Sequence, residues 1–196
     1  MSEIFLSILM PTLPSRRATF EPLFDKLAAQ VKDKYFVEVI ALLDNRRMTI
    51  GEKCNALMGS ARGRFLTFVD DDDDVSPNYI DSIWNAMSMT AWDADVITFG
   101  VACELRWRDG RVQSSTVFPD VNDPNDDFRD GAITKRKPMQ IAVWRTELAR
   151  TSRWAHAQQE ADVAWASKLW PQVKAQHKIT DVLYTYKFSE AGTEAK

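Results

Sequence analysis

Five consecutive aspartates, Asp70–Asp74, directly follow a short apolar run, Phe65–Val69. The apolar run has the composition of a buried strand, and Ser76 and Pro77 are typical of the N-cap and first position of a helix. The acidic run is therefore predicted to lie in a loop between a strand and a helix. Five adjacent carboxylates repel one another, so their position calls for a compensating cation. A hard divalent metal ion with oxygen ligands is the natural candidate.

Strand-like and helix-like segments alternate through the first half of the chain. Amphipathic helical patterns lie between apolar runs typical of buried strands, at residues 4–10, 36–43, 65–69 and 96–101. Thr49 and Glu52 have the spacing of a capping box, which marks the start of the second helix. This order predicts an α/β fold with a Rossmann-like, mostly parallel central sheet, helices on both faces and right-handed crossovers.

The ends of the first three strands are expected to form one crevice. In open α/β sheets, ligands bind beyond the carboxyl ends of the strands. Those ends carry Pro11 and Thr12, then Asp44 and Asn45, and finally the acidic run. The sequence therefore predicts a polar binding site built from three loops.

The second half of the chain is less regular. Asp109 and Gly110 lie between two strand-like segments, the signature of a β-hairpin with a tight turn. Residues 118–138 lack periodicity and are predicted to form a long loop, either a lid or a segment that faces an acceptor. The remaining elements are expected to be short helices at residues 142–150 and 160–170 and a strand at residues 182–188.

The composition is that of an ordinary globular domain, with 45% hydrophobic and 27% charged residues. A formal net charge of -3 gives no basic field for nucleic acid or a membrane surface. Two cysteines and two histidines, widely spaced, do not indicate a zinc site or a disulfide scaffold. There is no signal-type segment and no apolar run near the ~20 residues of a membrane helix, so a cytoplasmic protein is expected.

Four stretches together resemble the GT-A fold glycosyltransferases of the family 2 type, in a short form. They occur in the family's order and spacing, and they are Leu6–Thr12, Glu38–Asn45, Gly51–Asn55 and Phe68–Ile80. The similarity is weaker in the rest of the chain. The resemblance implies one domain, residues 1–196, with a nucleotide-sugar-binding half at 1–102 and a less regular acceptor and catalytic-base half at 103–196.

The resemblance also implies roles for residues at the strand ends. Pro11, Thr12 and Asp44 would line the nucleotide base pocket, where Asp44 accepts a hydrogen bond from a uracil N–H. Lys53 and Asn55 would approach the ribose or diphosphate from a helix start, where the helix dipole favours an anion. The competing interpretations are a solvated turn residue for Asp44 and a solvated first-turn lysine for Lys53.

For the acidic run, the resemblance implies that Asp70 contacts the ribose and the metal. Asp72 is then the main ligand of Mn²⁺ or Mg²⁺. Asp73 would help to orient Asp70 and Asp72 without binding the metal ion itself. Asp71 belongs to the nucleotide-sugar-binding loop, but its side chain is expected to be solvated, like that of Asp74.

A calcium loop is an alternative interpretation of the same letters. Asp70, Asp72 and Asp74 match the first three ligand positions of such a loop. However, Val75 stands where the loop needs glycine, and Asp81 stands in place of its final glutamate. The metal motif of the glycosyltransferases is therefore preferred.

Sugar transfer also requires a base that deprotonates the acceptor hydroxyl. In the family this base is the aspartate of a Glu-Asp pair near a helix start, which Asp162 matches best, although Ala161 stands in the glutamate position. Glu160 is the second candidate. An aspartate in a first helical turn can also simply favour the helix dipole. His156 and His177 are not assigned to the metal, because lone histidines are more often surface or packing residues.

Other aromatic and basic residues allow two interpretations each. The tryptophans of the second half can stack on an acceptor, but large aromatics are more often core residues. These are Trp107, Trp144, Trp154 and Trp165. The basic clusters are interpreted mainly as solvated faces, which would favour a diphosphate or a polyanionic acceptor if they lined the crevice. They are Arg16-Arg17, Arg46-Arg47, Arg62-Arg64 and Lys135-Arg136-Lys137.

These features predict a metal-dependent inverting glycosyltransferase. Its donor would be a nucleoside diphosphate sugar, most simply UDP-linked, and its acceptor a hydroxyl of a glycan, a small molecule or a modified nucleic acid. A nucleotidyltransferase with a similar sheet is one alternative, but it should carry a glycine-rich loop after the first strand, where Leu13 and Pro14 stand. A non-catalytic nucleotide-sugar-binding protein is the other, and the missing glutamate before Asp162 favours it.

Overall fold

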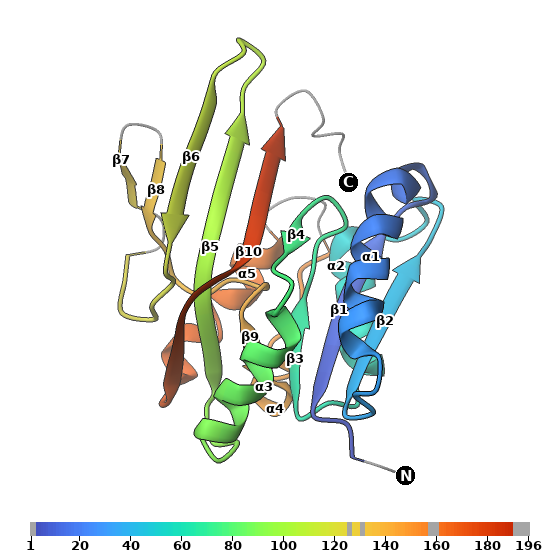
Figure 1. Cartoon of the computed structure of the whole chain (residues 1–196), viewed down its shortest axis with the longest axis vertical. Coiled ribbons are helices and arrows are strands. Elements are labelled where there is room, and N and C mark those ends of the chain that lie inside the picture. The colour runs from blue at the N-terminus through green and yellow to red at the C-terminus, as the bar shows by residue number, and fades with distance from the viewer. Residues whose placement is uncertain (1–2, 125–126, 130–131, 157–160, 190–196) are drawn as a thin grey trace.

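A computed structural model describes residues 3–124, 127–129, 132–156 and 161–189 (Figure 1). The strands are β1 (Leu6–Thr12), β2 (Val37–Leu43), β3 (Phe65–Phe68), β4 (Asp74–Val75), β5 (Val96–Arg106), β6 (Val112–Val117), β7 (Asp127–Arg129), β8 (Ala132–Lys135), β9 (Val143–Arg145) and β10 (Gln176–Ser189). The helices are α1 (Arg17–Val31), α2 (Ile50–Ser60), α3 (Tyr79–Met89), α4 (Thr146–Ala149) and α5 (Ala161–Ala166), with 3-10 turns η1 (Pro14–Arg16) and η2 (Trp170–Gln172).

The main sheet has the strand order β2-β1-β3-β9-β5-β10-β4, and β6 pairs with β5 outside this path. β2, β1 and β3 are parallel, and so are β5 and β10. β9 is antiparallel to both β3 and β5, and β4 and β6 are also antiparallel to their neighbours. The expected α/β class is therefore confirmed, but the sheet is mixed and only partly parallel. β9 inserts between β3 and β5 at the start of the predicted helix 142–150, of which α4 forms a part, and β4 and β6 add further antiparallel pairs.

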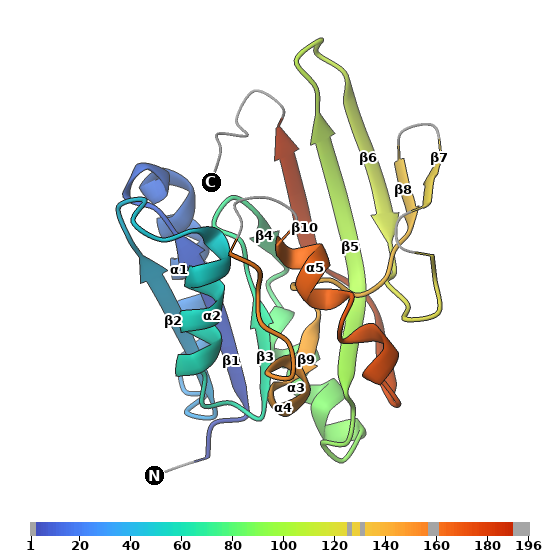
Figure 2. The same cartoon turned by 180° about the vertical axis from the view of Figure 1, so that it is seen from behind.

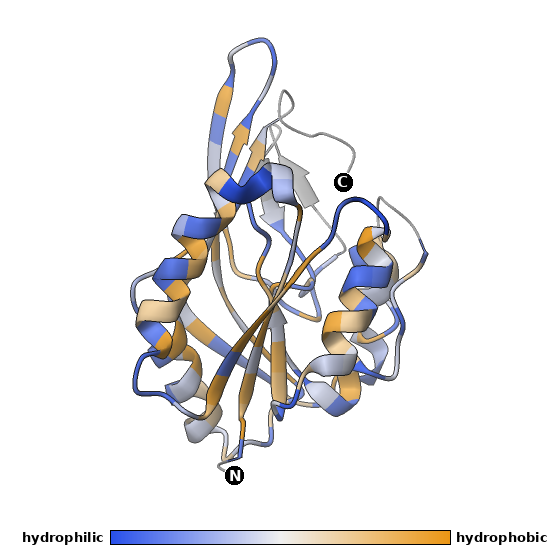
Figure 3. Ribbon diagram, turned by 90° about the vertical axis from the view of Figure 1, so that its right-hand side faces the viewer, coloured by the Kyte–Doolittle hydropathy of each residue, from blue (hydrophilic) through white to orange (hydrophobic). Residues whose placement is uncertain are grey.

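Helices cover both faces of the sheet. α1 and α3 lie on one face (Figure 1), and α2, α4 and α5 lie on the other (Figure 2). Each face has its own apolar core, because alternate residues of the strands point to opposite sides. Ile8 and Phe65 pack under α1 and α3, whereas Leu9 and Leu66 pack under α2. Figure 3 shows apolar residues concentrated on the strands and on the helix sides that face them.

The local signals for the second helix are confirmed. Thr49 caps α2, and the capping box with Glu52 is complete, since the Glu52 backbone N–H donates to Thr49 and the Glu52 carboxylate accepts from the Thr49 backbone N–H. The helix after the acidic run begins later than expected. α3 starts at Tyr79 with Asn78 as its N-cap, and Ser76 precedes it in a turn.

The second half contains more strand than the sequence pattern predicts. The predicted hairpin is present, with Gly110 at φ +85 in its turn, and it projects beyond the rest of the sheet (Figure 1). Its first strand is continuous with the fourth predicted strand, so β5 spans eleven residues. The predicted long loop contains β7 and β8, which form a small separate sheet. Among the described residues, no helix is long and apolar enough to cross a membrane.

Three of the four tryptophans considered as an acceptor platform are core residues. Trp144 and Trp165 are fully buried, and Trp154 is 5% exposed. Trp165 stacks on Trp154, with ring centroids 5.2 Å apart, and meets Trp144 edge to face. The platform interpretation is therefore wrong for these three. Trp107 lies instead in the β5–β6 hairpin, where it contacts Phe188 of β10.

Candidate functional site

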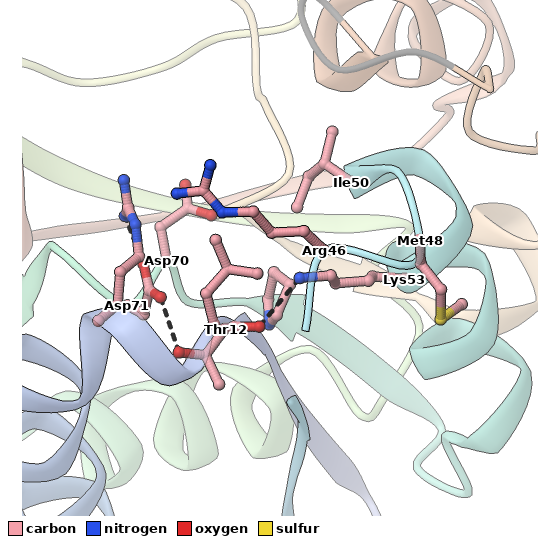
Figure 4. A pocket seen from close by; sticks show the side chains of 10 residues that line it. Thr12, Arg46, Met48, Ile50, Lys53, Asp70 and Asp71 are labelled. Atoms are coloured by element: carbon pink, nitrogen blue, oxygen red, sulfur yellow. Dashed lines mark hydrogen bonds and ion pairs between the residues drawn. The ribbon is translucent and has the colours of Figure 1, made fainter. Parts of the chain in front are cut away.

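A cavity of about 190 Å³ lies at the carboxyl ends of β1, β2 and β3 (Figure 4). Its lining comes from the loops that follow these strands and from the first turns of α2. The lining residues are Pro11, Thr12, Leu13, Arg16, Arg46, Met48, Ile50, Lys53, Asp70 and Asp71. The three polar loops therefore converge, as their positions at the strand ends require.

Asp44 and Lys53 form an ion pair at this site. The Lys53 ammonium also donates to the carbonyl oxygen of Thr12 at 2.9 Å, and the second Asp44 oxygen accepts from the backbone N–H groups of Arg47 and Met48. Burial alone would raise the pKa of Asp44, but Lys53 and the two N–H groups outweigh it and hold the pKa below its usual range. The solvated interpretations of Asp44 and Lys53 are therefore wrong, because both side chains are almost buried.

The first three aspartates of the acidic run are bound by Gln140, Thr12 and Arg16. Asp70 lines the cavity, and its carboxylate accepts from the Gln140 amide at 3.2 Å. Asp71 is 3% exposed; one of its oxygens accepts from the Thr12 hydroxyl and the other from Arg16, each at 2.7 Å. The same Arg16 nitrogen donates to Asp72, also at 2.7 Å. The expectation that the Asp71 side chain is solvated is therefore wrong.

The last two aspartates are bound to other elements. Asp73 is 6% exposed and accepts from the Tyr184 hydroxyl at 2.7 Å and from the Lys187 backbone N–H at 2.8 Å. Burial, and then the nearby Asp70, raise the pKa of Asp73 well above its usual range. Asp74 is partly exposed and pairs with Lys26 of α1 at 2.6 Å. The acidic loop is thus attached to β10 on one side and to α1 on the other.

Two arginines of the cavity were interpreted from the sequence as parts of solvated clusters. Arg16 ends η1, directly after β1, and its side chain is 15% exposed. Arg46 follows β2 with a φ of 55, and its side chain extends across the cavity towards Asp70 (Figure 4). Their position just after strand ends was the signal that could have identified them. With Lys53, they give the cavity three cationic groups beside the carboxylates of Asp70 and Asp71.

Asn55 is used in packing rather than in lining the cavity. Its amide nitrogen donates to the Trp154 carbonyl oxygen at 3.0 Å, and its amide oxygen accepts from the Trp154 backbone N–H at 3.1 Å. Gly51, one turn earlier, faces the same segment, because a Cβ there would lie 1.8 Å from the Ala155 carbonyl oxygen. The structure therefore separates Asn55 from Lys53, which the sequence had placed together at a ribose or diphosphate.

Asp162, the first of the predicted base candidates, is not among the residues that line the cavity. Asp162 is half-buried in the first turn of α5, a helix that contacts α2. Glu160 lies outside the described residues. His156 approaches Glu52 at 3.3 Å, and His177 is part of β10.

The acidic residues allow a test of the predicted metal site. In the described part of the chain, no three carboxylate, imidazole or thiolate side chains are grouped so as to hold a metal ion. Mg²⁺, however, is commonly bound by one or two carboxylates together with water and substrate phosphates. A metal ion at Asp70 and Asp72 would therefore need further ligands, such as water and the phosphates of a bound substrate.

Comparison with known proteins identifies the fold. No family model matches the sequence, and no curated protein matches it. Among solved structures, S. aureus TarS 1-349 in complex with UDP-GlcNAc is similar, with a TM-score of 0.65 and 15% identity over 98% of this chain. TarS 1-349 in complex with UDP gives a TM-score of 0.63 and 14% identity over 95% of this chain. The chain thus has a GT-A-like glycosyltransferase fold, and it spans about 60% of the TarS chains that it matches.

Proposed function

We propose that this protein is a metal-dependent, inverting glycosyltransferase that moves a sugar from a UDP-linked donor to an acceptor hydroxyl. The observation that carries the proposal is the cavity at the strand ends, where Arg16, Arg46 and Lys53 face the same space as Asp70. Cationic groups suit a diphosphate, and a carboxylate suits ribose hydroxyls. TarS, which has the same fold, was crystallised with UDP-GlcNAc, which supports a donor of this class.

The nucleotide base is proposed to bind at the apolar side of the cavity. Pro11, Leu13, Met48 and Ile50 line the cavity and offer surfaces against which a flat base can pack. Asp44 shapes this side because it holds the backbone of residues 47–48 and the Lys53 ammonium. Its carboxylate therefore acts on the base pocket mainly through these neighbours.

The diphosphate is proposed to lie beside the acidic loop, with Asp70 and Asp72 holding Mn²⁺ or Mg²⁺. When bound, the metal ion stabilises the negative charge that develops on the leaving diphosphate. Arg46 and Lys53 add fixed positive charge on the same cavity, and such preorganised charge lowers the barrier without reorganisation during the reaction. Tyr184 and Asp73 hold the loop in position from the β10 side.

Asp162 is proposed as the base that takes the proton from the acceptor hydroxyl. Its place at the start of α5, beside α2, supports this role because α2 carries Lys53 into the cavity. Attack from the side opposite the diphosphate would invert the configuration of the transferred sugar. Glu160 remains the second candidate.

Release of UDP from a panel of UDP-sugars, measured with and without Mn²⁺, tests the proposal. We expect Mn²⁺-dependent release of UDP, which increases when an acceptor is present. Release of pyrophosphate instead would identify a nucleotidyltransferase. Firm UDP binding without turnover of any donor would identify a non-catalytic nucleotide-sugar-binding protein. Either of these results overturns the proposal.

A further inference from the structure

Arg16 bridges two neighbouring aspartates with a single nitrogen atom. Its Nη1 donates to Asp71 Oδ1 and to Asp72 Oδ2, each at 2.7 Å. The Arg16 backbone N–H is itself bound to the Leu13 carbonyl oxygen at 3.0 Å, so the residue has a fixed position after β1. Arginine keeps its charge at any ordinary pH, and it therefore compensates the acidic loop without a metal ion.

The two halves of this bridge differ in how readily they can separate. Asp71 is 3% exposed, and both of its oxygens are engaged, one by Arg16 and one by Thr12. The Asp72 side chain is 34% exposed. Separating a buried charge pair is far more costly than separating an exposed one. Asp71 is therefore the permanent partner of Arg16, and Asp72 is the partner that can leave.

The bridge also affects what can bind at Asp72. A divalent cation near Asp72 is repelled by the guanidinium and competes with it for the carboxylate charge. Arg16 also lines the cavity in which the diphosphate is proposed to bind. Phosphate oxygens are strong bidentate partners of a guanidinium, so a bound diphosphate competes with Asp72 for Arg16.

We propose that Arg16 is a positioning residue that keeps Asp72 from the metal ion until the nucleotide arrives. This inference rests on the proposed function, in which Asp72 is a metal ligand. The diphosphate takes the place of Asp72 at the Arg16 guanidinium while Asp71 keeps its bond, and Asp72 can then bind the metal ion. Metal ion and nucleotide therefore bind cooperatively, and the metal ion alone binds weakly.

The control of Asp72 by Arg16, called the gate below, can be tested without turnover. Isothermal titration calorimetry measures the binding of Mn²⁺ to the nucleotide-free protein. Arg16→Gln removes the competing cation. The variant should bind Mn²⁺ at least about fivefold more tightly than the wild type, because fivefold is the lower end of the usual coupling between two binding sites. Arg17→Gln is the matched control, because the Arg17 side chain is 77% exposed and pairs with Glu21 of the same helix. It should bind Mn²⁺ as the wild type does.

Arg16→Lys keeps the charge but lacks the planar guanidinium, and it should give an intermediate Mn²⁺ affinity. If Arg16→Gln fails to fold because Asp71 loses its buried partner, the Mn²⁺ affinity of Arg16→Lys is compared with that of the wild type instead. Equal Mn²⁺ affinity in the wild type and the folded Arg16 variant overturns the gate. If Mn²⁺ then still binds the wild type in the presence of UDP, the proposed function stands and only the gate fails. If Mn²⁺ binds none of these proteins even with UDP, the metal dependence fails, and the gate fails with it.

Discussion

Lys53 carries an ammonium group that is buried between two loops of the cavity. It pairs with Asp44 and donates to the Thr12 carbonyl oxygen, and the residue as a whole is 4% exposed. A buried charge is tolerated only when its partners are present, because removal of one partner leaves the other without compensation. At the residue scale, this pair is therefore expected to matter for stability as well as for ligand binding.

The first prediction concerns this pair. Lys53→Met should lower the free energy of unfolding by about 3–5 kcal/mol, the cost typical of breaking a buried ion pair. Urea unfolding measures the change. Lys32→Met is the control, because Lys32 is exposed at the end of α1, and it should change stability by no more than about 0.5 kcal/mol. Equal effects of the two substitutions would show that the Lys53 ammonium is solvated.

Asp73 leads to a prediction about pH. Burial and the nearby Asp70 raise its pKa well above the usual range, so the folded protein binds this proton more tightly than the unfolded chain does. The resulting stabilisation is complete below the unfolded pKa of about 4 and is lost as the pH rises through the folded pKa.

Asp73→Asn removes this titration; its amide oxygen can still accept from the Lys187 backbone N–H, and its NH₂ group can donate to the Tyr184 hydroxyl oxygen. The free energy of unfolding of the wild type, relative to Asp73→Asn, should therefore decrease as the pH rises from about 4. Urea unfolding of both proteins at a series of pH values gives this difference. The contributions of the other titrating groups cancel, because both proteins contain them. Parallel stability profiles would contradict the raised pKa.

The residues of the site were only partly predictable from the sequence. The strand ends indicated Thr12 and Asp70, and the helix start indicated Lys53; all three line one cavity. The position of Arg16 just after β1 could have placed it near the cavity, but nothing local shows that Arg16 reaches the acidic loop while its neighbour Arg17 faces water. Such pairing depends on the packing of β1 beside β3, which is a long-range property.

At the scale of elements, α2 is attached to the segment at Trp154 by two hydrogen bonds from one side chain. Asn55→Ala removes both bonds, leaves buried backbone groups without partners, and should lower the free energy of unfolding by about 1–3 kcal/mol. Thermal or urea unfolding measures this change. Asn78→Ala is the control, because Asn78 is exposed and its side chain donates to the Ser82 hydroxyl rather than to a buried backbone group. A loss no larger than that of the control would show that Asn55 is not structural.

The elements of the first half were predictable because their signals are local. The capping box of Thr49 and Glu52 and the apolar stripe of α2 depend on residues a few positions apart. β9 was not predictable, because Val143 and Trp144 become a strand only through the free edges of β3 and β5 on either side. The secondary structure of this segment is therefore set by its pairing with distant strands and not by its helical sequence pattern.

At the scale of the whole molecule, the acidic loop joins most parts of the fold. Arg16 and Thr12 connect it to the end of β1, Lys26 connects it to α1, and Tyr184 connects it to β10. A ligand that binds Asp70 and Asp72 therefore acts on a loop that is already anchored on three sides. This anchoring favours a rigid acidic loop.

The central claim is that the five aspartates have different roles, with Asp72 at the metal ion and Asp74 in a partly exposed ion pair. The most direct test is Mn²⁺-dependent release of UDP from a UDP-sugar by the wild type, Asp72→Asn and Asp74→Asn. We predict that Asp72→Asn lowers the rate by about 10²-fold or more, because charge stabilisation of the leaving diphosphate is lost. Asp74→Asn should have a nearly wild-type rate and lose at most about 1 kcal/mol of stability. Equal loss of activity in both variants, or full activity of Asp72→Asn, would contradict this account.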